Sequence, residues 1–122
     1  MEVMSSDEFA WEYKGRMLHL HRDEICYFHS EGRKTYIHTT KHTYELRGNL
    51  GDAERKVRSL PMVRTHKSFL IHLRNLENLT GSEAIMKNGE RLPVSAKRRK
   101  AAFDTARVYF FPEENKKDNE HS

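Results

Sequence analysis

Residues 18–39 read LHLHRDEICYFHSEGRKTYIHT, and this stretch decides the fold class. Leucines alternate with histidines over residues 18–21, and β-branched residues alternate with Tyr and His over residues 35–39. A period of two is typical of strands that bury one face. Ser30-Glu31-Gly32 supplies a turn between these runs. The stretch therefore predicts antiparallel strands joined by tight turns.

Two further turns extend this pattern toward the C-terminus. Lys41-His42 separates residues 35–39 from the short run Tyr44-Glu45-Leu46. Asn88-Gly89 lies between two more runs with strand character. Asn and Gly both tolerate a positive φ, so this pair predicts a two-residue hairpin with a type I′ turn.

Two segments favour helix instead. Asn49 can cap a segment in which apolar residues recur at helical spacing as far as Val57, and Pro61 stops it. A second helix is expected to begin after Ser95, as its cap, and to run toward Val108. The sequence thus predicts a mainly β fold, with antiparallel strands in small packed sheets and two short helices.

The length of 122 residues suits one domain and is too short for two ordinary ones. We expect an acidic N-terminal extension over residues 1–8 and one folded domain over residues 9–111. Residues 112–122 have almost no apolar side chain to bury, so they are expected to form a disordered polar tail.

The charge is unevenly distributed along the chain. The net charge is only +4, but residues 13–112 carry 20 basic and 10 acidic side chains. A basic body attracts polyanions, because each phosphate that Lys or Arg neutralises releases counterions from a nucleic acid. Anionic membrane surfaces offer the same attraction, so charge alone indicates only a class of partner.

The run Lys97-Arg98-Arg99-Lys100 is placed in the first turn of the second expected helix. Cations at a helix N-terminus oppose its dipole by about 0.3–1 kcal/mol each. They become favourable if a phosphate binds there, because backbone N–H groups and basic side chains then converge on one anion. The alternative is a solvated surface with a helix that begins one turn later.

Two other basic features are candidates for DNA contacts. Arg64, His66, Lys67 and Ser68 lie just before an apolar run, and their side chains can donate to phosphates or base edges. An ordinary turn before a buried strand is the alternative. Arg33-Lys34 follows the Gly32 turn, where loop cations are common on any surface.

The sequence indicates neither an enzyme nor a metal or cofactor site. It has no Gly-x-Ser-x-Gly motif, no phosphate-binding loop and no dinucleotide fingerprint. It has eight histidines, but no Cys pair or carboxylate partner appears at ligand spacing. The single Cys26 cannot form an internal disulfide. With no signal sequence and no run of about 20 apolar residues, we expect a cytoplasmic location without a membrane span.

Taken together and in this order, five stretches resemble the LytTR domain of bacterial transcription regulators. They read DEICYF at residues 23–28, GRKTYIHT at 32–39, YELRGNL at 44–50, VRTHKSFLI at 63–71 and KNGERLPVS at 87–95. The resemblance covers about residues 10–108. It implies an elongated, mostly β fold whose loops enter successive major grooves of bent DNA.

By position, the resemblance implies DNA contacts at Arg33-Lys34, at His66-Lys67 and near Lys97. His72 departs from the usual Asn, and Ala96 replaces a residue that is often basic, which puts the base preference in doubt. Members of the family often carry a receiver domain and dimerise on paired direct repeats. Only about a dozen residues precede the domain here, so we expect a stand-alone regulator or a fragment of a longer one.

The leading hypothesis is sequence-specific binding of double-stranded promoter DNA by a transcriptional regulator. The alternative is a protein-interaction module that sequesters a related regulator or a membrane partner through the same basic surface.

Overall fold

The computed structural model describes residues 6–114, and it confirms the mainly β fold class. The strands are β1 (Glu8–Tyr13), β2 (Arg16–His21), β3 (Ile25–Glu31), β4 (Lys34–Thr39), β5 (Thr43–Leu46), β6 (Met62–His66), β7 (Phe69–His72), β8 (Leu76–Leu79), β9 (Glu83–Met86) and β10 (Arg91–Pro93). The helices are α1 (Leu50–Lys56) and α2 (Arg99–Phe110), and single 3-10 turns span Arg22–Glu24 and Leu73–Asn75. Residues 112–114 are helical, and the rest of the predicted tail lies outside the described residues.

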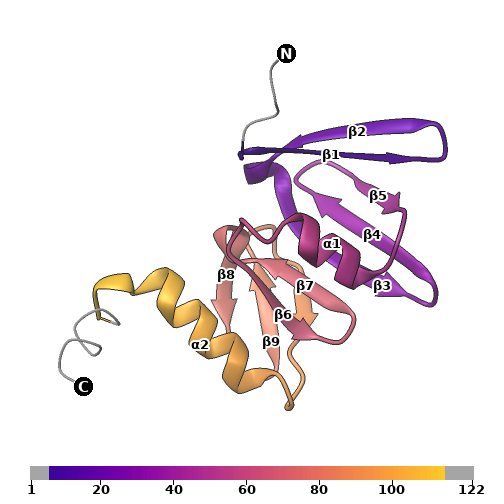
Figure 1. Cartoon of the computed structure of the whole chain (residues 1–122). Helices are drawn as coiled ribbons and strands as arrows, with labels where there is room; N and C mark the ends of the chain where they lie inside the picture. Colours follow the sequence, from indigo (N-terminus) through magenta and orange to yellow (C-terminus); the bar gives the residue numbers. More distant parts are fainter. Residues whose placement is uncertain (1–5, 115–122) are drawn as a thin grey trace.

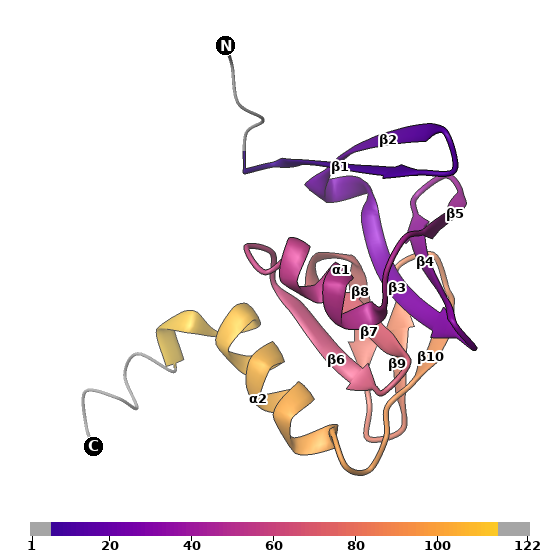
Figure 2. The same ribbon diagram turned by 45° about the vertical axis from the view of Figure 1, so that its right-hand side comes forward.

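All strand pairs are antiparallel and form three sheets. The central sheet has five strands in the order β5-β4-β3-β7-β6. A three-stranded sheet, β10-β9-β8, and the hairpin β1-β2 accompany it. Figure 1 shows the β1-β2 hairpin near one end of the molecule and α2 near the other. The two elements also lie at opposite ends in the rotated view of Figure 2.

Two hydrophobic cores lie on either side of the central sheet. The first joins the β1-β2 hairpin and α1 to the sheet, and Phe28 and Ile37 in it are fully buried. The second joins β8, β9, β10 and α2 to the sheet, with Ile71, Leu73 and Ala102 fully buried. Because both of their faces are buried, β3 and β7 are held in place. β3 precedes the basic β3–β4 turn, and β7 follows the basic β6–β7 turn.

The helix starts differ in how well the sequence predicts them. Asn49 caps α1 as predicted: its Oδ1 accepts from the N–H of Asp52 at 2.8 Å, and the Asp52 carboxylate accepts from the Asn49 N–H at 2.8 Å. Ser95 does not cap α2, which begins at Arg99. The reason is that the Ser95 N–H still pairs with the Thr65 carbonyl of β6 at 2.8 Å, so the chain turns only after this point.

The β9–β10 turn is not the predicted type I′ turn. Gly89 has a φ of +92°, but Asn88 does not have a positive φ. The N–H of Gly89 donates to the Met86 carbonyl, and the N–H of Met86 donates to the Glu90 carbonyl, both at 2.8 Å. This is a three-residue loop with a bulge at Gly89. Positive φ at two successive turn residues occurs instead at Lys14-Gly15, between β1 and β2.

Three histidines in the fold have lowered pKa values. His72 is fully buried, and its Nδ1 lies 2.8 Å from the Ile25 carbonyl oxygen; burial lowers its pKa. Burial also lowers the pKa of His29, and burial together with His29 lowers the pKa of His38 to about 4. The folded protein therefore favours the neutral form of all three rings.

The free energy of unfolding is expected to fall by roughly 2 kcal/mol between pH 7.5 and pH 5. The unfolded chain protonates these histidines near pH 6.5, whereas the folded protein resists protonation until lower pH. Stability is therefore full above about pH 6.5 and declines as the pH falls toward 4. Urea titrations at both pH values measure this slope. His38→Gln should make the slope shallower, and an unchanged slope in that variant would contradict the assignment.

Candidate nucleic-acid interface

Three basic segments lie along one edge of the molecule. They are the β3–β4 turn, the β6–β7 turn and the segment that precedes α2. In Figures 1 and 2 they follow one another along the lower right side, from the segment before α2 at the bottom to the β3–β4 turn at the right, although they are far apart in the sequence. Agreement between two views shows that the fold brings the segments to the same side.

The β3–β4 turn extends beyond the part of β3 that pairs with β7. β3 pairs with β7 only from Tyr27 to His29, and the turn itself has Gly32 at a φ of +63°. The Ser30 N–H donates to the Ser68 carbonyl at 3.0 Å, and this bond connects the end of β3 to the β6–β7 turn. Arg33 and Lys34 are exposed, so their charges face solvent.

The β6–β7 turn presents Lys67. Strand β6 ends at His66, whose Nδ1 accepts from the Ser68 N–H at 3.1 Å. This bond shapes the turn, and Lys67 is exposed at its tip. His66 and Ser68 are half-buried and hold the turn.

Arg64 reaches the same turn from inside the protein. Its Nη2 donates to Glu54 Oε1 of α1 at 2.8 Å, and its Nη1 donates to the Lys67 carbonyl at 3.1 Å. Only 18% of its side chain is exposed. The guanidinium predicted to contact DNA is therefore engaged by α1 and by the turn backbone, where it positions Lys67.

Arg64→Ala is expected to lower the free energy of unfolding by about 1–3 kcal/mol, because Glu54 and the Lys67 carbonyl each lose a charged donor. Arg64→Lys keeps one charge without the forked geometry and should recover part of the loss. Urea denaturation measures both variants. Equal stability of Arg64→Ala and the unchanged protein would show that the link is not formed in solution.

The basic run before α2 divides into two parts. Lys97 is exposed and Arg98 is half-buried, and both precede the helix. Arg99 Nε donates to the Gly81 carbonyl at 2.6 Å, and Lys100 Nζ pairs with Asp104 at 3.0 Å. The prediction of four cations in the first turn is wrong, because only Arg99 and Lys100 lie there, and both have partners.

Among residues 6–114, five of the predicted Lys and Arg site residues make no ion pair with an acidic side chain and no side-chain hydrogen bond. They are Arg33, Lys34, Lys67, Lys97 and Arg98. A polar hollow of about 280 Å³ lies beside the first of the basic turns. Its lining is Ser30, Gly32, Arg33, Lys34, Thr35, Asn49, Leu50, Gly51 and Arg64. The start of α1 lines this hollow through Asn49, Leu50 and Gly51, and the sequence had indicated only a capping role for Asn49.

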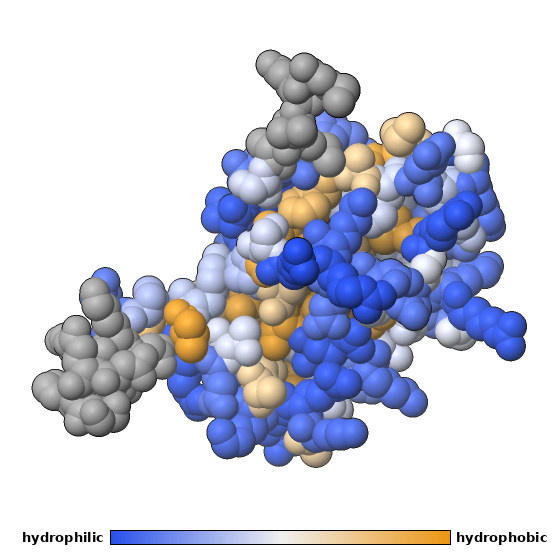
Figure 3. Space-filling model, in the orientation of Figure 1, coloured by the Kyte–Doolittle hydropathy of each residue, from blue (hydrophilic) through white to orange (hydrophobic). Residues whose placement is uncertain are grey.

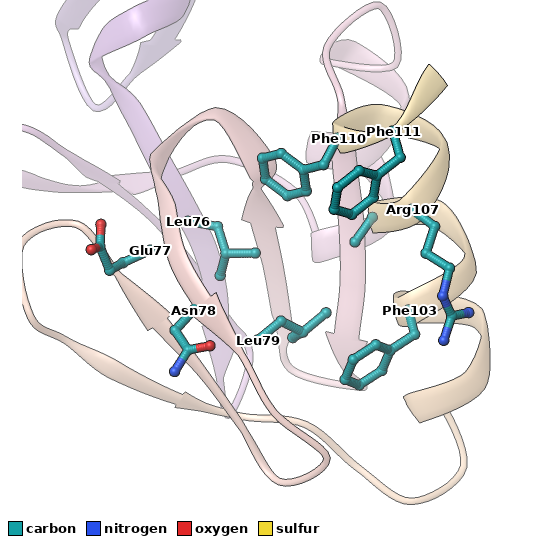
Figure 4. A pocket seen from close by; sticks show the side chains of 9 residues that line it. Leu76, Glu77, Asn78, Leu79, Phe103, Arg107, Phe110 and Phe111 are labelled. Carbon is teal, nitrogen blue, oxygen red and sulfur yellow. The ribbon is translucent and has the colours of Figure 1, made fainter. Parts of the chain in front are cut away.

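A second surface feature has a different character. A groove of about 530 Å³ lies between β8 and α2, and Figure 4 shows Leu76, Leu79, Phe103 and Phe110 around it. Figure 3 shows an apolar patch near the C-terminal end of α2, where Phe111 is 53% exposed. This groove is separate from the basic edge.

The described segment, residues 6–114, contains no cluster of three His, Cys, Asp or Glu side chains suited to a metal ion. It also contains no helix that is long and apolar enough to cross a bilayer. Cys26 is buried, and burial raises the pKa of its thiol, which disfavours the reactive thiolate.

The fold and its basic edge define a small β module with a surface suited to polyanions. The sequence profile of the LytTr DNA-binding domain matches residues 15–107, and the chain belongs to this family. It is therefore a DNA-binding domain of the kind found in transcription regulation.

A solved structure shares this fold. It is the LytTr DNA-binding domain of a methyl-accepting/DNA response regulator from Bacillus cereus, with a TM-score of 0.67 and 21% sequence identity. The similarity covers 82% of this chain and 95% of that one. None of the curated protein sequences matches this chain.

Proposed function

We propose that this chain binds double-stranded promoter DNA in a sequence-specific manner as a bacterial transcriptional regulator in the cytoplasm. The observation that carries the proposal is the placement of the β3–β4 turn, the β6–β7 turn and the segment before α2 on one side of the molecule. These segments carry Arg33, Lys34, Lys67 and Lys97, which are exposed and have no acidic partner among residues 6–114. Like charges that repel one another are compensated when phosphates lie against them.

The basic turns are proposed to enter the major groove. The groove is about 12 Å wide and admits narrow protein segments. Arg33, at the tip of the β3–β4 turn, has the forked donor geometry that matches the O6 and N7 acceptors of guanine. Lys67 and Lys97 suit phosphates, since an ammonium acts as a point charge without bidentate geometry. In this arrangement Arg33 contacts a base, and Lys67 and Lys97 fix the position of the domain on the DNA backbone.

Two copies are proposed to occupy paired direct repeats, as the family resemblance implies. Each copy would place its basic edge against one repeat, and the proposal predicts two footprints, one on each repeat.

Selection of bound fragments from a genomic DNA pool at about 150 mM salt tests this function. The proposal predicts enrichment of a shared sequence that contains a direct repeat, and protection of that sequence from nuclease by the purified protein. Equal recovery of all fragments would reduce the function to unspecific polyanion binding. Capture of a protein partner after nuclease treatment, without any enriched DNA, would favour the interaction-module alternative instead.

A further inference from the structure

Two imidazole rings contact each other across β3 and β4, the two strands joined by the β3–β4 basic turn. His29 Nδ1 of β3 lies 2.6 Å from His38 Nε2 of β4. The two residues are not directly opposite, because His29 pairs with Tyr36 and His38 pairs with Tyr27. A diagonal hydrogen bond of this kind resists sliding and twisting of one strand against the other.

A chain of ring contacts connects this pair to the second turn. The His29 ring stacks on Phe69 of β7, with centroids 5.7 Å apart and planes at 18°. Phe69 meets the His66 ring edge-on at 5.9 Å, and His66 Nδ1 accepts from the Ser68 N–H in the β6–β7 turn. The pair thus belongs to the hairpin that carries Arg33, and Phe69 and His66 link it to the turn that carries Lys67.

The other side of the pair is also fixed. The His38 ring stacks on Tyr27 with centroids 4.0 Å apart and planes at 11°, and its Nδ1 lies 3.0 Å from Thr43 Oγ1 of β5. Tyr27 in turn donates its hydroxyl proton to Glu90 Oε2 at 2.6 Å. The Tyr27 ring, the Thr43 hydroxyl and the Glu90 carboxylate that holds Tyr27 together restrict the movement of the imidazoles.

The hydrogen bond is compatible with neutral pH. When both rings are neutral, one ring donates and the other accepts. After one proton is added, the charged ring donates and the neutral ring still accepts. Only a second added proton removes the acceptor. Burial lowers the pKa of His38 to about 4 with a further contribution from His29, while Glu90 raises it slightly. Glu31 and Glu90 likewise raise the pKa of His29, against the larger lowering by burial. The other titratable rings in contact are Tyr27 and Tyr36.

We propose that His29 and His38 are positioning residues for DNA binding, whose mutual hydrogen bond sets the β3–β4 turn relative to the β6–β7 turn. This proposal rests on the proposed function. Binding surfaces tolerate displacements of only about 0.5 Å between their contact groups, so a small rotation of one turn misplaces Arg33 when Lys67 is bound.

Two double variants separate the hydrogen bond from ring packing. His29→Asn with His38→Gln places amide groups near the positions of Nδ1 and Nε2, and it keeps the hydrogen bond while removing both rings. His29→Phe with His38→Phe keeps the stacked rings and removes the hydrogen bond. The measurements are affinity for a duplex enriched by selection, affinity for a duplex of random sequence, and the free energy of unfolding.

The proposal predicts that the Asn/Gln variant binds the enriched duplex within about threefold of the unchanged protein. The Phe/Phe variant should lose about tenfold in that affinity, equivalent to about 1.4 kcal/mol, with little change toward random DNA. If Phe/Phe binds the enriched duplex normally, or if both variants lose affinity in proportion to their stability, the pair has only a structural role.

If the Phe/Phe variant does not fold, the single variants His29→Phe and His38→Phe carry the same comparison, because each removes the hydrogen bond with one ring left in place. Failure of the unchanged protein to prefer the enriched duplex would overturn the proposed function, and this proposal with it. Normal preference in every variant would overturn the positioning proposal alone.

Discussion

Replacing both Lys67 and Lys97 with glutamate is expected to weaken binding to the enriched duplex by roughly 100- to 1000-fold at about 150 mM salt. Both side chains are exposed on the basic edge and have no acidic partner among residues 6–114. The change removes two cations that neutralise phosphates and adds two anions that repel them. Because no ion pair of the described residues is lost, the fold should keep its stability.

The control for position on the surface is Lys41→Glu, which makes half the change in charge of the double variant. Lys41 is also exposed, but it lies in the β4–β5 turn, at the opposite end of β4 from the β3–β4 turn. Its replacement should change affinity only a few-fold, through net charge. Lys67→Ala and Lys97→Ala should each reduce the slope of log affinity against log salt by about 1. An equal loss in Lys41→Glu and in the double variant would show that position on the surface does not matter.

Phe28→Ala should have the largest effect on stability, about 3–5 kcal/mol. The ring is fully buried in the first core, between α1, the β1-β2 hairpin and the central sheet, and it packs against Trp11 with centroids 6.0 Å apart. Truncation leaves a cavity in a packed interior. Since domains of this kind are stable by only about 5–15 kcal/mol, much of the margin is removed.

Urea denaturation followed by circular dichroism measures this loss. Met17→Ala is the control, because 70% of Met17 is exposed and its truncation should change stability by less than about 0.5 kcal/mol. If Phe28→Ala and Met17→Ala had equal stability, the assignment of the core between α1 and the sheet would be wrong.

Local sequence signals predicted those parts of the fold that local physics determines. The period-two pattern around Ile37 and the Asn49 cap both correspond to what the structure shows, because strand alternation and capping depend on neighbours in the chain. Strand β1 was not predicted, although Phe9 and Trp11 alternate with polar or small residues before the Lys14-Gly15 turn. A short run of this kind gains its stability from pairing with β2, which is a tertiary effect.

The site was predictable in position but not in the role of each residue. Sequence reasoning identified the three basic segments, and the structure places all three on one edge. The sequence could not show that Arg64 pairs with Glu54, or that Arg99 donates to Gly81, because these partners are 10 and 18 residues away. Ser95 was taken for a helix cap because its backbone pairing with Thr65 leaves no local trace.

The most direct test of the central claim is a map of the DNA contact surface by amide chemical shifts, recorded as the enriched duplex is added to the isotopically labelled protein. The account predicts that the largest shifts cluster at residues 31–34, 66–68 and 95–99, with small shifts around the β4–β5 turn and the groove between β8 and α2. Large shifts confined to that groove, with the three basic segments unchanged, would contradict it.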